Sequence, residues 1–331
     1  MTTVGRMINE TDVIMAYRLI MGREPENQRV IEEHAGYFQD SHALRAGFMA
    51  SDEFRTILEM PAARVDGVGV KPLDWPPQKV DVNVSPDMLE RMVKRIENEF
   101  LYLGSREPHW SVLTADRFKA ENISPHEEEF YASGQQPLAS LMAAAARCHV
   151  DLSHHQSCFE LGCGLGRITM WLGRHFRQVI AGDISASHLE HARETARRAG
   201  LTNVSFLHLN AIGHYRRLPF FDAFFSVIML QHNPLPLMAH VLEIILEKLA
   251  PGGIAYFQIP TDLAHYEFSA ASYLDSTAPV GDVEVHCVPQ AALFEIVERT
   301  GCRVLEIRED SALGAGAISN TLLLRKNKDM P

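Results

Sequence analysis

The feature of this sequence that most constrains its fold is a glycine-rich turn between a predicted strand and a predicted helix. Ser157–Leu161 is the strand, Gly162–Gly166 is the turn, and the helix is predicted from Arg167 to Phe176. Glycines in such a turn let the backbone approach a ligand closely, and the N-terminus of the helix favours anionic groups. The turn therefore predicts a small-molecule site within a layered α/β domain.

The chain alternates between predicted strands and helices after this turn. Further strands are predicted at 178–182, 204–209, 223–230, 254–259, 302–308 and 319–325, and further helices at 187–199, 234–249 and 290–300. This alternation predicts an α/β fold with a doubly wound, mostly parallel sheet of seven strands. Ser187 and Glu190 have capping-box spacing at the start of helix 187–199. No helix separates the last two strands, so we expect them to form an antiparallel hairpin at the sheet edge.

The chain divides into four predicted parts. They are a small helical domain at 1–60, a linker at 61–84, a helical lid or extension at 85–150, and the α/β domain at 151–331. Apolar residues recur at helical spacing in the first part, whereas prolines and glycines interrupt the second. Ser85 and Pro86 have the N-cap and first-turn pattern of a helix start. The apolar positions of that helix, which include Ile96 and Phe100, keep to one face up to about residue 103.

Composition excludes several partner classes. The 331 residues carry a formal net charge of −11, and binding to nucleic acid depends on Lys and Arg, so we expect no nucleic-acid partner. The five cysteines include no CxxC pair, which argues against both a disulfide framework and a zinc cage. We find no signal peptide and no stretch near the roughly 20 apolar residues of a membrane span. We therefore expect a cytoplasmic protein without an integral membrane segment.

The spacing within the glycine turn distinguishes between nucleotide cofactors. A dinucleotide site of the G-x-G-x-x-G type needs a third glycine at position 167, where this chain has Arg167. The third glycine is instead Gly166, which disfavours NAD. Asp183 ends the next predicted strand, 19 residues after Gly164, where a carboxylate can accept both hydroxyls of an adenosine ribose. The alternative for Asp183 is an N-cap on the following helix.

Three segments resemble class I S-adenosylmethionine-dependent methyltransferases. Phe159–Thr169 and Ala181–Ser185 resemble the first two motifs of that family, and Leu249–Gly253 resembles the turn before its fifth strand. The segments occur in the family order, and the resemblance covers residues 155–325. It implies that residues 151–331 are a methyltransferase domain with S-adenosyl-L-methionine as cofactor and no metal.

The resemblance also implies a set of cofactor-binding residues. Glu160, Gly162 and Gly164 would line the methionine part, with Cys163 and Arg167 beside them in the turn. Asp183 would hold the ribose and Ile184 would lie against the adenine. The family often has an acidic residue at the end of the third strand for the adenine amino group. Here Asn210 and Ala211 stand at that place, and an amide oxygen can accept the same bond.

Catalytic candidates follow the fourth predicted strand. Leu230, Gln231 and His232 should lie at the carboxyl end of the sheet, where ligands bind in doubly wound folds, and we expect Leu230 and Gln231 to bind the cofactor. A hydroxyl acceptor needs a base, so His232 is a candidate for that role. The alternative is that His232 is an ordinary hydrogen-bonded loop residue.

The long segment after the fifth predicted strand supplies a second candidate pair. Glu284 and His286 would lie on the same side if this segment is a strand, where they would form a histidine–carboxylate base. The alternative is a solvated edge strand. A mononuclear metal site built from His232, Asp262, His265 and His286 is a weaker alternative, and we expect no metal.

Two further segments upstream are candidates for covering the cofactor. By resemblance to related bacterial methyltransferases, Tyr131 and Gly134 would close over the methionine end, and 109–114 would contribute to a lid. The alternative for Tyr131 is aromatic packing between helices.

The N-terminal part has its own resemblance. Tyr17–Pro25 and Phe48–Phe54 resemble a short helical domain of bacterial cell-surface and glycosyltransferase-associated proteins. This implies a context of polysaccharide or glycolipid assembly and a domain that can recruit a partner protein.

The resulting hypothesis is an O-methyltransferase that acts on a sugar hydroxyl of a bacterial surface glycan or its precursor. One alternative is a methyltransferase for a small secondary metabolite or an amine, which needs no strong base. Another is a non-catalytic scaffold that keeps a vestigial cofactor fold.

Overall fold

The computed structural model describes residues 8–21, 23–54, 77–276, 281, 283–310, 312–313 and 316–328. The chain forms two compact units, residues 1–72 and 73–331, and each has a hydrophobic core of its own. The proline- and glycine-rich segment predicted as a linker lies largely outside the described residues.

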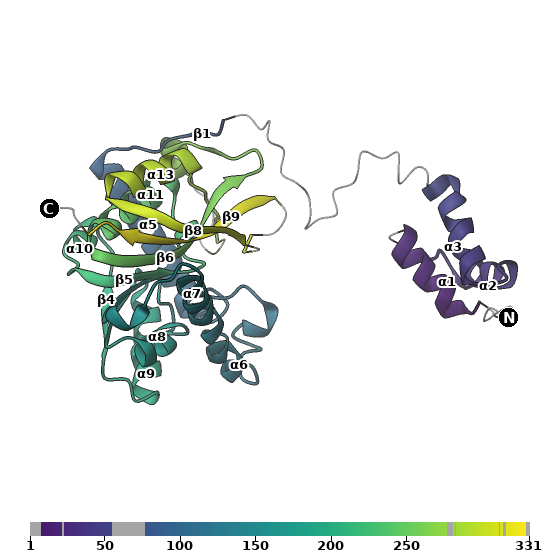
Figure 1. Ribbon diagram of the computed structural model, residues 1–331, viewed down its shortest axis with the longest axis horizontal. Helices are drawn as coiled ribbons and strands as arrows, with labels where there is room; N and C mark the ends of the chain where they lie inside the picture. The colour runs from purple at the N-terminus through teal and green to yellow at the C-terminus, as the bar shows by residue number, and fades with distance from the viewer. Residues whose placement is uncertain are drawn as a thin grey trace. The chain divides into compact units, whose positions relative to one another are not determined.

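The smaller unit is helical (Figure 1). Its helices are α1 (Glu10–Ala16), which continues as a π-helical turn (Tyr17–Met21), α2 (Gln28–Tyr37) and α3 (Ser41–Ala50). An Asn or Asp caps each α-helix by accepting an N–H from its first turn. The core is formed by Val13, Ala16, Tyr17, Ile31, Leu44 and Phe48.

The larger unit is built on a seven-stranded sheet with the order β4-β3-β2-β5-β6-β9-β8. The strands are β2 (Ser157–Leu161), β3 (Gln178–Asp183), β4 (Val204–His208), β5 (Phe221–Ser226), β6 (Leu249–Leu263), β8 (Cys302–Asp310) and β9 (Ala317–Lys326). Neighbours from β4 to β6 pair in parallel, and β9 is antiparallel to both β6 and β8. The structure therefore confirms a mostly parallel sheet that ends in an antiparallel hairpin.

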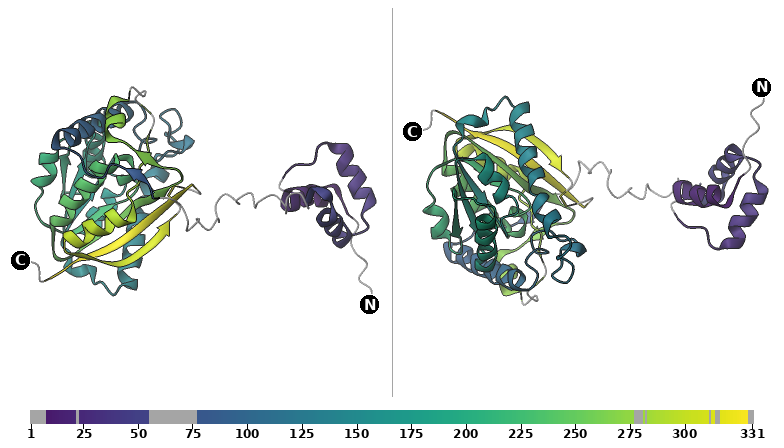
Figure 2. Two further views of the ribbon diagram at one scale, coloured as in Figure 1. Left: turned by 90° about the horizontal axis from the view of Figure 1, so that it is seen from above. Right: turned by 90° about the horizontal axis from the view of Figure 1, so that it is seen from below.

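Helices cover both faces of this sheet (Figure 2). One face packs against α7 (Gln135–Arg147), α8 (Thr169–His175) and α9 (Ala186–Arg198). The other packs against α5 (Pro86–Arg106), α10 (Ile212–Arg216), α11 (Leu235–Glu247) and α13 (Gln290–Arg299). Successive side chains of β2 alternate between the two cores, with Cys158 on the first face and Phe159 on the second.

Short elements complete the larger unit. A two-stranded parallel sheet joins β1 (Lys79–Val80) to β7 (Glu267–Phe268). The remaining helices and 3-10 turns are α6 (Glu127–Ala132), α12 (Ala270–Asp275), Asp116–Phe118, Leu152–His154 and Leu230–His232. Phe118 and Phe130 pack on Leu165, so segment 107–134 covers the glycine turn.

Three predicted element boundaries were wrong. Strand β6 covers Leu249–Leu263 and is longer at both ends than the predicted 254–259. Helix α9 is capped by Ser185, whose hydroxyl accepts from the His188 N–H, and not by a box of Ser187 and Glu190. Strand β5 ends at Ser226 and not at residue 230, because Ile228 turns the chain with a φ of 55°. The apolar run that follows this strand enters a 3-10 turn at the edge of the pocket described below.

All five cysteines are free thiols. No helix in the described part of the chain is long and apolar enough to span a membrane.

Candidate cofactor and acceptor site

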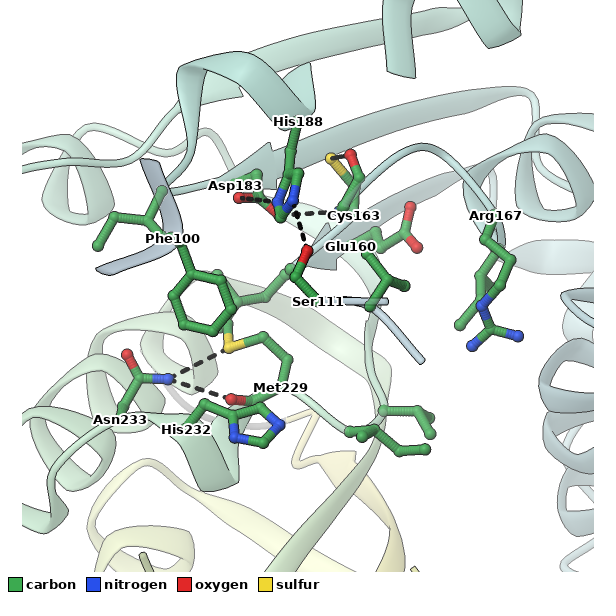
Figure 3. Close-up of a pocket in the computed structure, with 18 of the residues that line it drawn as sticks. Phe100, Ser111, Glu160, Cys163, Arg167, Asp183, His188, Met229, His232 and Asn233 are labelled. Carbon is green, nitrogen blue, oxygen red and sulfur yellow. Dashed lines mark hydrogen bonds and ion pairs between the residues drawn. The ribbon is translucent and has the colours of Figure 1, made fainter. Parts of the chain in front are cut away.

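A pocket lies at the carboxyl ends of β2, β3 and β5 (Figure 3). Eight residues proposed from the sequence line it: Glu160, Gly162, Cys163, Gly164, Arg167, Asp183, Ile184 and His232. Helix α5 and the segment around Ser111 form the opposite wall. The pocket thus occupies the crevice where doubly wound sheets bind their ligands.

The glycine turn has the backbone conformation that only glycine adopts easily. Gly162, Gly164 and Gly166 have φ values of 77°, 50° and 83°. A Cβ at Gly162 would overlap the Met229 side chain, and one at Gly164 would lie 2.8 Å from Val112 Cγ2. The glycines therefore permit both the turn and the close approach of the pocket walls.

Asp183 is buried at one end of the pocket, and each of its carboxylate oxygens accepts one backbone N–H. Its Oδ2 accepts the Gly164 N–H at 2.8 Å, and its Oδ1 accepts the Ser185 N–H at 2.8 Å. His188 Nδ1 lies 3.8 Å from Oδ1. Burial alone would raise the pKa of Asp183, but His188 and the two N–H groups outweigh it and lower that pKa. Asp183 is thus an ionised acceptor that stabilises the glycine turn, while Ser185 caps the helix.

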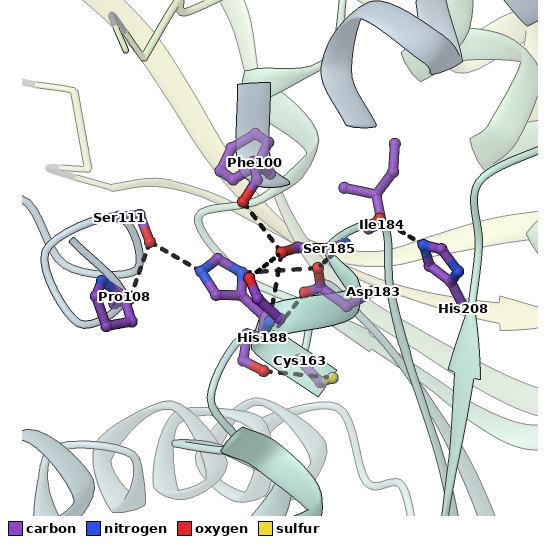
Figure 4. Close-up of polar contacts among 11 residues, drawn as sticks. Phe100, Pro108, Ser111, Cys163, Asp183, Ile184, Ser185, His188 and His208 are labelled. Atoms are coloured by element: carbon purple, nitrogen blue, oxygen red, sulfur yellow. Dashed lines mark hydrogen bonds and ion pairs between the residues drawn. The ribbon is translucent and has the colours of Figure 1, made fainter. Parts of the chain in front are cut away.

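His188 connects this carboxylate to the wall on the other side of the pocket (Figure 4). Its Nε2 lies 3.0 Å from Ser111 Oγ, and the Ser111 hydroxyl donates to Pro108 O at 2.9 Å. Because the hydroxyl proton goes to Pro108, Ser111 accepts from Nε2–H and is no nucleophile. The contact is therefore a tie between segment 108–112 and α9.

Glu160 and Arg167 lie at the other end of the pocket. Glu160 accepts one hydrogen bond, from Thr169 Oγ1 at 2.6 Å, and burial raises its pKa to about 7. Arg167 Nη1 donates to Ser133 Oγ at 3.1 Å, and burial lowers the pKa of Arg167 to about 10. Arg167 Nε is buried without a hydrogen-bond partner among the described residues. Both groups are thus poorly compensated in their ionised forms.

This set of donors and acceptors fits S-adenosylmethionine. The unpaired N–H of Arg167 matches the carboxylate of the methionine part, and the Glu160 carboxylate matches its ammonium group. Each oxygen of Asp183 keeps a lone pair for a ribose hydroxyl. The glycine turn leaves the room that backbone contact with the cofactor requires.

A second, larger cavity of about 580 Å³ adjoins this pocket. The two share three lining residues, Ile96, Phe100 and His232. Its other walls come from α5, from α12 and from Val283 and Glu284. We call it the acceptor cavity, because the shared residues separate it from the cofactor pocket by a single layer of side chains.

His232 stands at this boundary in a fixed orientation. Its Nδ1 lies 3.0 Å from the backbone oxygen of Glu284, so Nδ1 carries the proton and Nε2 does not. Burial lowers the pKa of His232, which favours the neutral ring. The Glu284 side chain is itself held by Arg95 Nη2 at 3.0 Å and by His286 Nε2 at 3.2 Å.

The expectation of a strand that carries Glu284 and His286 was wrong. Residues 283–289 form no strand, and the two side chains meet through a local bend. Glu284 lines the acceptor cavity, whereas His286 lies behind it, 2.8 Å from Tyr266 Oη. His286 is therefore placed to hold Glu284 and lines neither cavity.

Six residues that the sequence analysis assigned to the cofactor lie outside the lining of the pocket. They are Tyr131, Gly134, Asn210, Ala211, Leu230 and Gln231. They instead support it: a Cβ at Gly134 would overlap the Arg167 backbone, and the Tyr131 hydroxyl lies 3.1 Å from Thr195 Oγ1. Asn210 Nδ2 donates to Glu97 on α5 at 2.7 Å.

Gln258 anchors the turn that carries the boundary residues. Its Oε1 accepts the Ile228 N–H at 3.0 Å, and its Nε2 donates to Gln231 Oε1 at 3.0 Å and to Ser319 Oγ at 2.6 Å. A β-branched residue is strained at a positive φ, so the turn at Ile228 needs such support. The buried amide joins the turn to β6 and β9.

Twelve lining residues were not proposed from the sequence. They are Ile96, Phe100, Ser111, Val112, Leu161, Ile168, His188, Tyr215, Val227, Ile228, Met229 and Asn233. The apolar face of the helix at 85–103 was a signal for Ile96 and Phe100, and the expected lid at 109–114 contains Ser111 and Val112. His188 had no signal beyond its place in the first turn after Asp183.

Metal binding receives no support from the geometry. Within the described ranges, no three His, Cys, Asp or Glu side chains are grouped so as to hold a metal ion.

Comparison with known proteins gives one family match. Residues 159–253 match the family described as methyltransferase domain. A 23S rRNA (uracil(1939)-C(5))-methyltransferase RlmD of Photorhabdus laumondii is 26% identical over 111 residues, which are 33% of this chain and 25% of the relative. The corresponding protein of Francisella tularensis subsp. novicida is 31% identical over 75 residues, 23% of this chain and 17% of the relative. The chain thus spans a quarter or less of the length of these curated relatives.

Solved structures of low identity also match. The magnesium protoporphyrin IX methyltransferase of Synechocystis PCC 6803 with bound SAH has a TM-score of 0.49 at 14% identity, over 70% of this chain and 99% of that one. The N-methyltransferase NodS of Bradyrhizobium japonicum has a TM-score of 0.43 at 16% identity, over 69% and 98%. Residues 159–253 are thus similar to a methyltransferase domain, and the strand order of the larger unit is that of the class I S-adenosylmethionine-dependent methyltransferase fold.

Proposed function

We propose that this protein transfers the methyl group of S-adenosylmethionine to a hydroxyl of a sugar in a bacterial surface glycan or its precursor. The observation that carries the proposal is His232, whose unprotonated Nε2 belongs to a ring shared by the cofactor pocket and the acceptor cavity. A base at this boundary is what a hydroxyl acceptor requires and what an amine does not.

Positioning and proton transfer are the contributions of this chain. Bound S-adenosylmethionine supplies the methyl group on a sulfonium. The hydroxyl oxygen would bond to the methyl carbon as the bond from that carbon to sulfur breaks, which leaves a neutral thioether, and His232 Nε2 would accept the hydroxyl proton. The Glu284 backbone oxygen keeps Nδ1–H in place throughout, so the ring presents the correct nitrogen.

Arg95 and His286 act through Glu284 in this scheme. They hold its side chain from two directions and thereby fix the backbone that orients His232. We infer that they are positioning residues and that His232 alone among them handles the proton.

The sugar as acceptor rests on two further observations. The acceptor cavity, at about 580 Å³, is in the size range of small-ligand sites. The N-terminal helices resemble a domain of glycan-assembly proteins, so we propose that this unit recruits a partner protein of that process. A small metabolite or an amine is the alternative acceptor.

An RNA acceptor is the alternative that the curated relatives suggest, because the relatives named above act on 23S rRNA. The net charge of −11 argues against it, since RNA binding relies on many cationic contacts. We therefore place a small or glycan acceptor first.

The test is a mass-spectrometric assay with isotope-labelled cofactor and a set of sugar, amine and RNA acceptors. With the right acceptor, we expect His232→Ala to lower kcat by a factor of about 10² to 10⁴ and to change the affinity for S-adenosylhomocysteine by less than about 3-fold. His240→Gln, a change at a histidine outside both cavities, is the matched control. Unimpaired turnover by His232→Ala/His286→Ala would instead indicate an amine acceptor. Failure of the wild-type chain to bind the cofactor at millimolar concentration would favour a vestigial scaffold.

A further inference from the structure

We propose that the acceptor carries a phosphate or diphosphate group, which Arg91 and Lys94 bind at the outer end of the acceptor cavity. This inference rests on the proposed function and narrows its substrate class to glycosyl phosphates. The three steps that support it are the placement of cations on α5, their partners, and their distance from His232.

Five polar residues of α5 line one wall of the acceptor cavity, and one of them, Glu99, is acidic. Arg91, Lys94, Arg95 and Asn98 follow one another at the spacing that places side chains on one helix face. Three cations within five residues are a local excess in a chain whose formal net charge is −11. This wall is therefore suited to an anion.

The partners of these cations show which of them are available. Arg95 is committed: its guanidinium binds Glu284 and the Tyr273 backbone oxygen, and it stacks over the Tyr273 ring at 4.1 Å. Lys94 reaches Glu97 at 2.5 Å; the Lys94 side chain is 65% exposed and that of Glu97 only 11%, so Lys94 would be shared between this carboxylate and a ligand. Arg91 has no ion-pair partner within the described part of the chain.

The acidic groups of the cavity are already engaged. Glu284 pairs with Arg95 and His286, and Glu99 accepts the Gly281 N–H at 2.6 Å. Glu99 keeps its negative charge, so the lining holds the three cations Arg91, Lys94 and Arg95 against the two carboxylates Glu99 and Glu284. Guanidinium and ammonium groups are the side chains that bind phosphate oxygens best.

The distance along α5 fixes where the anion stands relative to the reacting hydroxyl. Phe100, which lies next to the His232 ring, follows Arg91 by nine residues, or about 14 Å along the helix axis at about 1.5 Å per residue. Side chains on a helix lean toward its N-terminus, so an anion bound by Arg91 and Lys94, nine and six residues before Phe100, stands on the order of 9 to 14 Å from the hydroxyl along the helix axis. A ring hydroxyl and a diphosphate on the anomeric carbon of one sugar suit this separation.

The first experiment uses pyrophosphate as the probe. Calorimetry is done on the full chain saturated with S-adenosylhomocysteine, for the wild type and for Arg91→Gln/Lys94→Gln. We expect millimolar or tighter binding by the wild type and at least about 10-fold weaker binding by the double variant, because each charged contact to phosphate is lost. Arg106→Gln, at an exposed cation of the same helix outside the cavity, should bind as the wild type does. Equal binding by all three proteins, or no binding by the wild type, overturns the inference.

The second experiment separates possible sources of the phosphate. A free hexose, its 1-phosphate and its nucleoside diphosphate conjugate are compared as acceptors. We expect the double variant to raise KM at least about 10-fold for phosphorylated acceptors, with kcat unchanged and the KM of the free hexose unchanged. Preference for the conjugate over the 1-phosphate assigns a diphosphate.

The two experiments distinguish failure of the phosphate site from failure of the proposed function. If pyrophosphate binding depends on Arg91 and Lys94 but no sugar is methylated, the site stands and the function is wrong. If a free hexose is methylated as well as its phosphates, the function stands and the site is wrong.

Discussion

The two ends of the cofactor pocket each contain a buried carboxylate, yet the pKa values of the two carboxylates are shifted in opposite directions. Asp183, at the end of β3, accepts two backbone N–H groups and lies beside His188, and its pKa is lowered. Glu160, in β2, accepts a single hydroxyl, and its pKa rises to about 7. The number of donors, and not the depth of burial, decides which carboxylate remains ionised.

This difference indicates how each end meets its part of the cofactor. The Asp183 end, which we assign to ribose, is preorganised because its charge is compensated within the chain. The Glu160 end, which we assign to methionine, also contains Arg167 with an unpaired Nε and a lowered pKa. A zwitterionic ligand supplies the opposite charge for both groups, so this end is completed by the cofactor.

The largest effect should come from the preorganised end. Asp183→Asn removes the charge beside His188 and an acceptor of the ribose. We expect the affinity for S-adenosylhomocysteine to fall on the order of 100-fold and the free energy of unfolding to fall by about 2 kcal/mol. Calorimetry and chemical denaturation measure the two. Asp222→Asn is the control, since Asp222 accepts from Gln156 N and Ser157 N far from the pocket lining. That variant should lose stability and keep its affinity; equal losses of affinity in both would contradict the comparison.

Arg167→Gln should have the next largest effect. We expect it to weaken cofactor binding without lowering the free energy of unfolding. Loss of a charged contact to the methionine carboxylate should weaken S-adenosylhomocysteine about 10- to 30-fold while adenosine, which lacks that group, binds unchanged. Removal of a poorly compensated buried cation should leave the free energy of unfolding equal or higher. Calorimetry with both ligands tests this. An equal loss of adenosine affinity would show that Arg167 acts through the fold, and Arg174→Gln on the exposed side of α8 is the control.

The pH dependence of cofactor binding should report the ionisation of Glu160. Its folded pKa of about 7 lies above the ordinary 4.5, so the carboxyl is largely protonated below pH 7 and must ionise to bind an ammonium group. We expect the affinity for S-adenosylhomocysteine to rise up to about 10-fold from pH 6 to pH 8 and then to level off. The unfolded chain loses this proton near pH 4.5, whereas the folded chain loses it only near pH 7. The free energy of unfolding of the cofactor-free protein should therefore fall as pH rises from 4.5 to about 7. Both trends should be absent in Glu160→Gln; a flat wild-type profile would refute the assignment.

Ser111→Ala should have the smallest effect. It removes the tie from segment 108–112 to His188 without touching Asp183 itself. One lost neutral hydrogen bond should weaken S-adenosylhomocysteine by about 2- to 5-fold. Amide exchange in segment 108–112 should become faster. Ser105→Ala, at an exposed hydroxyl bonded to Tyr102 O, is the control, and matching exchange in the two variants would rule out the tie.

The sequence predicted the two carboxylates because both belong to one local unit of strand, turn, helix and strand. Gly164 and Asp183 are 19 residues apart, and the pattern of the parallel sheet places them together. Ser111 and His188 are 77 residues apart, and the bond between them depends on how α5 and segment 107–115 fold over the pocket. No periodicity encodes that arrangement.

The boundary of the acceptor cavity was only half predictable. The carboxyl end of β5 placed His232 near the cofactor, because that edge of a parallel sheet faces the crevice. The sequence did not indicate that Glu284 orients His232 through its backbone oxygen, since a carbonyl group carries no signature of residue type. The bend at Ile228 ends β5 at Ser226. The sequence pattern instead predicted that the strand continues to residue 230, because the residues that follow Ser226 are apolar.

The anchoring of the Ile228 turn by Gln258 has an evolutionary consequence. The turn is fastened to β6 and β9, and neither strand contributes a side chain to the cofactor pocket or to the acceptor cavity among the described residues. The position of the turn is therefore set independently of the acceptor cavity, whereas the orientation of the His232 ring still depends on Glu284 and on its partners Arg95 and His286. Over evolution, substitutions at cavity residues that do not contact His232 can alter which acceptor fits, while a single buried amide keeps the turn in place.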